Sequence, residues 1–189
     1  MYPDGDPLIR ISSGELGTKF EGATRPGHFD GVLAVVNKFF NIIRPAAGNH
    51  PVNAYFGQKD AQQYILIQRM VRDFNHDVIM RPVAIVREDN GLALSSRNSY
   101  LSDEERESAL VLSRTLAMLR ENSLNRGFHE IDLDGARERI NSTPGVRLDY
   151  LELVDPMTFG EPTEESERVL ALVAAFVGPT RLIDNMDLR

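Results

Sequence analysis

An alternation of amphipathic helices and short apolar strands between His28 and Val86 restricts the fold of this chain more than any other feature. Residues 28–43 carry apolar side chains three and four positions apart, which predicts a helix that stops at Pro45, and residues 60–74 repeat the pattern. Short apolar segments at 54–56, 78–80 and 83–86 predict strands. Because strand, loop, helix and strand follow one another, the sequence predicts a parallel α/β layer.

The second half of the chain predicts a different architecture. Ser102 and Glu105 form a capping-box pattern that opens a helix running to about Glu121, and a shorter helix is predicted over 133–141. Apolar segments at 148–154, 169–177 and 181–183 predict a small antiparallel sheet. We therefore expect two domains, residues 1–98 and residues 99–189, with loop structure over residues 1–27.

Composition narrows the class of protein. The 189 residues carry a formal net charge of -7, which disfavours nucleic acid as the main partner but leaves room for a small anionic substrate in a local basic pocket. There is no cysteine, so thiolate catalysis and disulfides are excluded, and we expect a cytoplasmic location. The longest apolar run, 169–177, is too short to cross a membrane.

The segment from Gly57 to Asp60 lies where a predicted strand ends and a predicted helix begins. Free backbone N–H groups and the positive end of the helix dipole meet at such a point and favour a phosphate. Gly57 allows close approach of a ligand, Gln58 follows it, and Lys59 adds a mobile positive charge. Spacing alone favours a plainer interpretation, with a solvated lysine and an aspartate that caps the helix. One turn later Gln63 is either a ligand contact or a surface glutamine.

A second polar loop, from Leu94 to Arg97, also follows a predicted strand. Ser95 and Ser96 supply two hydroxyls and Arg97 a guanidinium with five N–H donors, which together suit an oligophosphate. An ordinary polar loop is the alternative. Since binding crevices in open α/β sheets lie beyond the carboxyl ends of strands, we expect the two loops to converge on one triphosphate.

Glu21, Arg25 and His28 form a third cluster, with His28 at the start of a helix. A structural ion pair and a capping histidine are the alternative. Asp155 and Asp184 are predicted to be turn and surface residues. No group of residues has metal-ligand spacing, and no nucleophile elbow is present.

Five sequence blocks, in the same order, resemble those of the pantothenate synthetases and span nearly the whole chain. They are RPGHFDGV at 25–32, FGQKDAQQ at 56–63, DNGLALSSRNSYL at 89–101, LDYLELVD at 148–155 and RLIDN at 181–185. The resemblance implies a partial Rossmann-like nucleotidyltransferase domain followed by a small α+β lid domain. It also implies that the family's N-terminal portion is missing and that the connection at 45–53 is longer than usual.

The resemblance implies an ATP-dependent, AMP-forming ligase. Pantoate attacks the α-phosphate of ATP to give pantoyl adenylate and pyrophosphate, and β-alanine then displaces AMP to give pantothenate. Residues 57–60 are expected to contact ATP, with Lys59 on the phosphates and Asp60 near the ribose, and Gln63 to bind pantoate. Val86 is expected to offer backbone contacts near the adenine, residues 94–97 to form the second phosphate loop, and Mg²⁺ to accompany ATP.

Because the resemblance implies that the family's N-terminal portion is missing from this chain, we expect these 189 residues alone to show little or no synthetase activity. A coupled assay of AMP release with pantoate and β-alanine measures this, and robust turnover would contradict it. The full-length parent is expected to be a homodimer. Two alternatives stay open: a non-catalytic piece that binds a nucleotide, and another adenylyltransferase of the same fold, against which Gln63 and the block at 25–32 argue.

Overall fold

The chain forms two compact units, Met1–Val83 and Ala84–Arg189, called unit 1 and unit 2 below. The structure is a computed structural model that describes residue 5, residues 7–43 and residues 52–189. The predicted long connection at 45–53 therefore lies almost entirely outside the described residues. Each unit has its own hydrophobic core.

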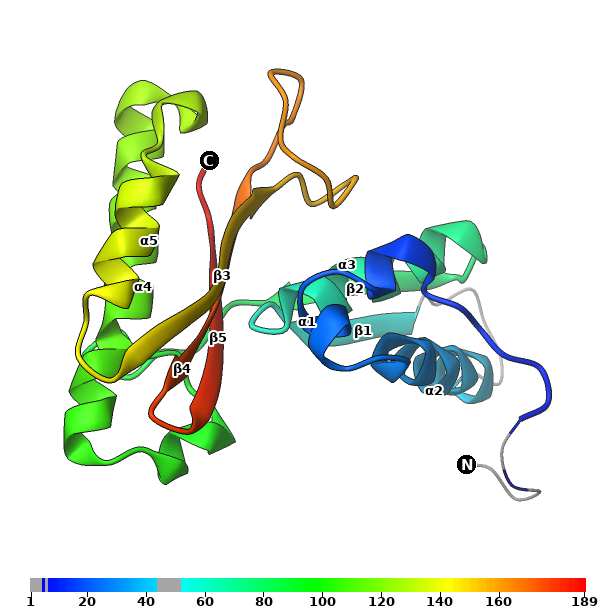
Figure 1. The fold of residues 1–189 in the computed structure, drawn as a ribbon. Helices are drawn as coiled ribbons and strands as arrows, with labels where there is room; N and C mark the ends of the chain where they lie inside the picture. The colour runs from blue at the N-terminus through cyan, green and yellow to red at the C-terminus, as the bar shows by residue number, and fades with distance from the viewer. Residues whose placement is uncertain (1–4, 6, 44–51) are drawn as a thin grey trace. The chain divides into compact units, whose positions relative to one another are not determined.

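Unit 1 is the predicted parallel α/β layer (Figure 1). Its elements are η1 Gly14–Gly17, α1 Glu21–Thr24, α2 His28–Ile42, β1 Val52–Gly57, α3 Ala61–Asp73 and β2 Val78–Val83. The two long helices match the predicted ones to within a residue or two. The expectation of loop over residues 1–27 is modified by η1 and α1, each only four residues long.

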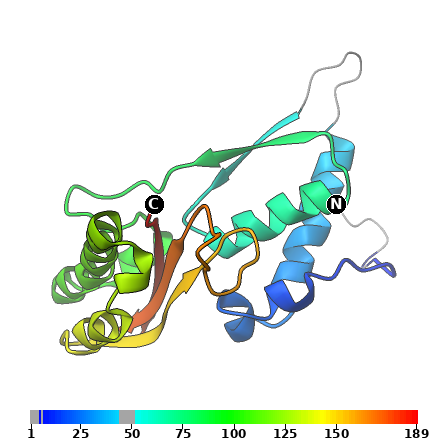
Figure 2. The same ribbon diagram turned by 90° about the horizontal axis from the view of Figure 1, so that it is seen from above.

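Strands β1 and β2 pair in parallel, with Val52 opposite Val78 and Gly57 opposite Val83. Figure 2 shows α2 and α3 together on one side of this pair. Alternate side chains of the two strands therefore enter the core. Core residues of α2 and α3 pack against the strand residues Ala54, Phe56, Val78 and Met80. Tyr55 and Val83 belong to the opposite face and are exposed.

Pro82 stands at the outer side of β2. The N–H of Gln58 donates to the carbonyl of Val83 at 2.9 Å, so the main-chain groups of Val83 face β1. Because successive residues of a strand face opposite neighbours, those of Pro82 face away from β1. Proline has no N–H, and this is the position in a sheet that tolerates it.

Unit 2 packs two helices on one face of a three-stranded antiparallel sheet in the order β3-β4-β5 (Figure 1). Its elements are η2 Ser96–Tyr100, α4 Asp103–Arg126, η3 Phe128–Glu130, α5 Leu133–Asn141, β3 Val146–Val154, β4 Leu170–Val177 and β5 Thr180–Asp187. Both halves of the predicted capping box at Ser102 and Glu105 are formed. The central strand β4 is almost completely buried, as its continuous apolar sequence indicates.

Three details of the sequence prediction are wrong. Residues 84–86 are not a strand, because β2 runs through Pro82 and ends at Val83. Helix α4 continues five residues beyond Glu121, because its polar last turn still buries Ser123. The helix ends at Gly127, whose φ is 90°. Strand β5 extends on both sides of 181–183, because its whole length pairs with β4.

The boundary between the units falls earlier than the predicted one near Asn98. Residues 86–94 form a small hairpin, in which the N–H of Glu88 donates to Leu92 and that of Leu94 to Val86, at 2.8 and 2.9 Å. Arg87 then binds Asp184 of β5, which ties the hairpin to unit 2. The turn at 89–91 was predicted and is present.

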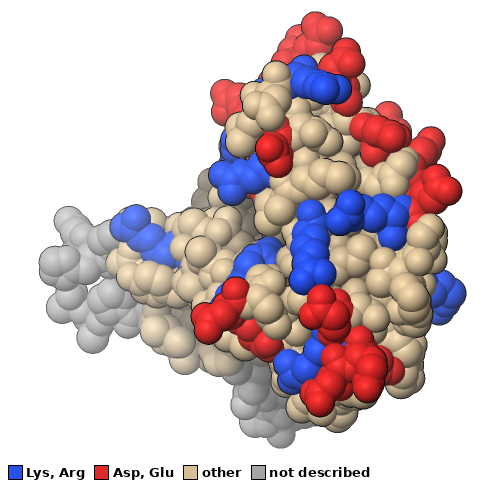
Figure 3. Space-filling model, turned by 90° about the vertical axis from the view of Figure 1, so that its left-hand side faces the viewer, with Lys and Arg blue, Asp and Glu red and all other residues tan. Residues whose placement is uncertain are grey.

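In the part of the chain that the structure describes, no helix is both long and apolar enough to cross a membrane. Figure 3 shows Asp and Glu side chains bordering the Lys and Arg side chains on the face in view. Ion pairs such as Arg137 with Glu152 and Arg181 with Asp149 bring the two signs of charge together.

Candidate functional site

The first predicted loop has the geometry that its sequence indicates. Gly57 is the last residue of β1, and Asp60 is the N-cap residue of α3. The Asp60 carboxylate is exposed and accepts no capping hydrogen bond, which contradicts the plainer interpretation of this residue as a helix cap. Asp60 and the first turn of α3 therefore present a carboxylate and helix N–H groups at the strand end.

Two neighbouring glutamines of α3 have different environments. Gln63, the predicted pantoate contact, is half-buried, whereas Gln62 is 4% exposed. The Gln62 side-chain amide donates to the carbonyls of Leu16 and Lys19 at 2.8 and 2.9 Å, and its oxygen accepts from the N–H of Glu21 at 3.0 Å. Sequence reasoning missed Gln62, because nothing in two adjacent glutamines tells which one is buried.

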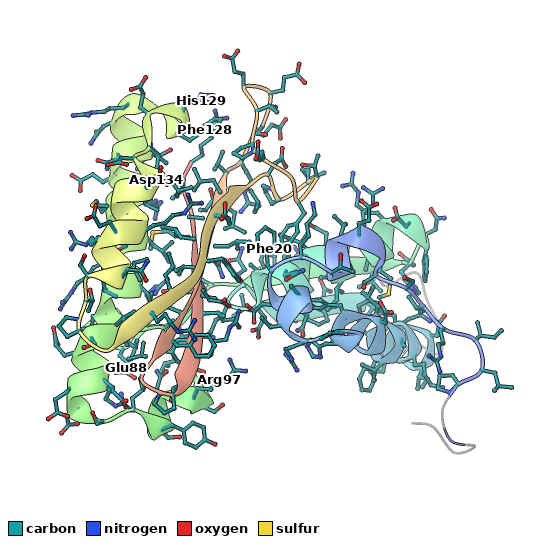
Figure 4. All side chains as sticks on the ribbon, viewed as in Figure 1. Phe20, Glu88, Arg97, Phe128, His129 and Asp134 are labelled. Atoms are coloured by element: carbon teal, nitrogen blue, oxygen red, sulfur yellow. The ribbon has the colours of Figure 1, made fainter. Side chains whose placement is uncertain are left out.

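The bridge made by Gln62 holds the third predicted cluster beside α3. Phe20 lies between Lys19 and Glu21, two of the three residues whose main-chain groups Gln62 binds, and has a φ of 48°, a strained value for a residue with a large side chain (Figure 4). Glu21 opens α1, and His28 opens α2 after Gly27, whose φ is 76°. Gln62 therefore fixes the entry to the segment that carries Glu21, Arg25 and His28.

The electrostatics of His28 show that this cluster and the first loop are close together. Burial lowers the pKa of the imidazole below its ordinary value, and the charge of Arg25 lowers it further. The negative charges of Asp60 and Glu21 act in the opposite direction without cancelling the shift. His28 is thus neutral near pH 7 and can accept or donate a hydrogen bond there.

We expect the His28 imidazole to titrate below 6.5, the ordinary value for histidine, and its pKa to rise in Arg25→Ala because a repelling positive charge is removed. NMR titration of the histidine ring protons measures both values. A fall in the pKa of His28 in Arg25→Ala would contradict this electrostatic assignment.

The second predicted loop lies in unit 2 and runs into η2. The Ser95 hydroxyl accepts from the N–H of Arg97 at 3.2 Å, while Ser96 and Arg97 are exposed. The Arg97 guanidinium donates to the carbonyl of Arg181 at 3.0 Å. Residues Val86 and Leu94, both predicted to contact ATP, face each other through a main-chain hydrogen bond and expose their side chains.

The predicted site residues therefore form two groups. Unit 1 brings Glu21, Arg25 and His28 to the loop 57–60, and unit 2 assembles Val86 with the loop 94–97. The convergence of Lys59 and Arg97 on one triphosphate stays a prediction, because the loops belong to different units. Among the described residues, no three or more His, Asp or Glu are grouped as metal ligands.

A parallel α/β layer followed by an α+β unit with an antiparallel sheet defines an α/β protein with the fold of the pantothenate synthetases. The pantothenate synthetase of Thermus thermophilus is similar, with a TM-score of 0.86 and 41% sequence identity, over 100% of this chain and 66% of that one. A pantoate-beta-alanine ligase of Francisella tularensis, complexed with beta-gamma ATP and beta-alanine, matches with a TM-score of 0.70 and 33% identity, over 99% and 60%.

Sequence comparison leads to one family. The family model described as pantoate-beta-alanine ligase matches residues 1–187, and the chain belongs to that family. The pantothenate synthetase of Corynebacterium glutamicum is 50% identical over 192 residues, which cover all of this chain and 66% of the relative. That of Paenarthrobacter aurescens is 48% identical over 199 residues and is covered to 67%. The chain thus spans about two thirds of the length of these relatives.

Proposed function

We propose that this chain carries ATP- and pantoate-binding parts of an enzyme that condenses pantoate with β-alanine. The observation that carries the proposal is Lys59 in a loop between the end of β1 and the start of α3, in a chain of the pantoate-beta-alanine ligase family. A lysine there adds a positive charge to the N–H groups of a helix start, which is a suitable place for phosphate oxygens.

The proposed reaction has two steps. The carboxylate of pantoate attacks the α-phosphorus of ATP, which forms pantoyl adenylate as the bond to pyrophosphate breaks. The amine of β-alanine then attacks the acyl carbon, loses a proton, and displaces AMP. Neither step needs a covalent enzyme nucleophile, so the protein acts by positioning the substrates and stabilising charge.

The predicted residues divide this work. Lys59, Ser95, Ser96 and Arg97 bind phosphate oxygens, on which negative charge grows as pyrophosphate leaves. Asp60 lies near the ribose, Val86 near the adenine, and Gln63 binds pantoate. Glu21, Arg25 and neutral His28 support the loop 57–60 from the side of α1 and α2. Magnesium, which usually keeps several water ligands, would be held mainly by phosphate oxygens.

The proposed substrates, oligomeric state and location follow from the family resemblance. The pantoate-beta-alanine ligase of Francisella tularensis forms a complex with beta-gamma ATP and beta-alanine, which supports small-molecule substrates for this chain. A homodimeric parent protein and a cytoplasmic location remain predictions. Family membership argues against an adenylyltransferase of a different family.

We expect Lys59→Ala to weaken ATP binding by at least about tenfold, because one phosphate contact of about 1.4 kcal/mol is lost. Lys38→Ala is the matched control, since Lys38 lies on α2 of the same unit and has no predicted role. Calorimetric titration of each variant with ATP and Mg²⁺ measures the dissociation constants. Equal affinities for Lys59→Ala and wild type would refute the assignment of the first phosphate loop.

A further inference from the structure

Asn98, which directly follows the second phosphate loop 94–97, is buried although it belongs to an exposed turn. It is 4% exposed, whereas Ser96 and Arg97, just before it, and Ser99, just after it, are exposed. No role for Asn98 follows from its chemistry in the proposed reaction, since the phosphate-binding groups are the hydroxyls and the guanidinium before it. Its environment therefore needs a separate explanation.

The Asn98 side chain closes the loop on itself. Its Nδ2 donates to the carbonyl of Ala93 at 3.1 Å, across the loop, and to Oε1 of Glu88 at 3.3 Å. The main-chain N–H of Asn98 donates to the carbonyl of Ser95 at 3.0 Å. The side chain of Asn98 thus joins the two ends of the segment 93–98, and its main-chain N–H closes the turn that begins at Ser95.

Helix α4 holds this closure from the other side. The Arg106 guanidinium donates to the carbonyl of Asn98 at 2.9 Å and to the Glu88 carboxylate at 3.2 and 3.4 Å. Glu88 therefore accepts from both Asn98 and Arg106. Three segments meet here: the hairpin through Glu88, the loop end through Asn98 and α4 through Arg106. Figure 4 labels Glu88 and Arg97 in this part of unit 2.

The arrangement leaves one polar atom without a partner. Asn98 Oδ1 is buried and accepts no hydrogen bond from any of the described residues. Turning the amide over would not help, because it would place Oδ1 against the Glu88 carboxylate and the Ala93 carbonyl, which are both acceptors. A buried acceptor without a donor costs free energy, so the position of the amide is maintained at the expense of stability.

We propose that Asn98 is a positioning residue that fixes the loop 94–97 in the conformation that receives the phosphates of ATP. Glu88 and Arg106 orient Asn98, and Asn98 in turn sets where Ser96 and Arg97 stand. This inference rests on the proposed function only for the identity of the ligand. The ordering of the loop by Asn98 is independent of it.

The test uses Asn98→Asp, which keeps the shape of the side chain but removes both hydrogen bonds that the amide donates. It also places a second carboxylate against that of Glu88. ATP affinity should fall by at least about tenfold. Native-state hydrogen exchange should become faster at the amides of residues 94–98, whereas α4 and the β3-β4-β5 sheet keep their protection. A purely structural role would instead speed exchange throughout unit 2.

A compensating variant makes the test specific. In Asn98→Asp with Glu88→Gln, the new amide can donate to the introduced carboxylate at position 98 while its oxygen still accepts from Arg106, so affinity and loop protection should recover in part. Glu107→Gln is the matched control, because Glu107 pairs with Arg114 on the exposed side of the same helix. It should change neither quantity.

Two results would overturn the inference: unchanged exchange at 94–98 in Asn98→Asp, or ATP affinity within about twofold of wild type. If the wild-type chain does not bind ATP, the proposed function of the chain fails instead. The exchange measurement then decides alone whether Asn98 orders the loop.

Discussion

Replacing Arg87 with methionine is expected to destabilise unit 2 by about 3–5 kcal/mol, because it leaves the carboxylate of Asp184 buried without its cation. The two residues form a bidentate ion pair, with Arg87 nitrogens 2.7 and 2.9 Å from the two Asp184 oxygens. The Asp184 side chain is 4% exposed and that of Arg87 24%. Arg87 also donates to the carbonyl of Gly91 at 3.1 Å, so the guanidinium that binds Asp184 of the sheet also holds the turn of the hairpin 86–94.

Urea unfolding followed by circular dichroism measures the loss in Arg87→Met. Arg168→Met is the matched control, because Arg168 pairs with Asp187 of the same strand at a site where the arginine is 53% exposed, and exposed pairs contribute about 0–1 kcal/mol. Adding Asp184→Asn to Arg87→Met should recover part of the stability, since the buried charge is removed. Equal unfolding free energies for the two single variants would contradict this account.

Gln62→Leu is expected to destabilise the junction of η1, α1 and α3 by about 2–4 kcal/mol, because three hydrogen bonds of about 1 kcal/mol each are lost. The substitution leaves the carbonyls of Leu16 and Lys19 and the N–H of Glu21 without the partners they have in the folded chain. Phe20, whose φ is 48°, lies between two of these groups and loses its restraint.

Hydrogen exchange measured by mass spectrometry on peptides covering residues 16–28 reports the loss directly, and urea unfolding gives its size. Gln63→Leu is the matched control: the side chain of Gln63, next in sequence, makes no such bridge to the described residues 16–21, and its change should cost less than about 0.5 kcal/mol. Unchanged protection of residues 16–28 in Gln62→Leu would show that other contacts hold this segment.

Hydrophobic periodicity was sufficient for the elements with a continuous apolar face. Helix α2 follows from the spacing of Phe29, Leu33, Val36 and Phe40, which all enter the core of unit 1. The start of α4 follows from the capping box at Ser102. The end of α4 was missed although Gly127 marks it, because its last turns carry polar residues that periodicity does not count.

The candidate site was predictable only where local sequence determines local geometry. The loop 57–60 was placed correctly between β1 and α3, because Gly57 ends an apolar strand. The prediction of Asp184 as a turn or surface residue is wrong, because it lies in β5 and is 4% exposed, and the bridge made by Gln62 and the closure made by Asn98 were not predicted. Each depends on a partner between 10 and 97 positions away in the chain, and a single sequence does not reveal which distant polar groups meet.

Pro82 makes the parallel sheet of unit 1 extendable in one direction. A strand approaching the outer side of β2 would find no N–H at Pro82 and would break the ladder there. On the other side, β1 offers the main-chain groups of Asn53, Tyr55 and Gly57, and it pairs with no second strand among the described residues. Any polypeptide that widens this sheet is therefore directed to β1, and β2 resists edge-to-edge aggregation.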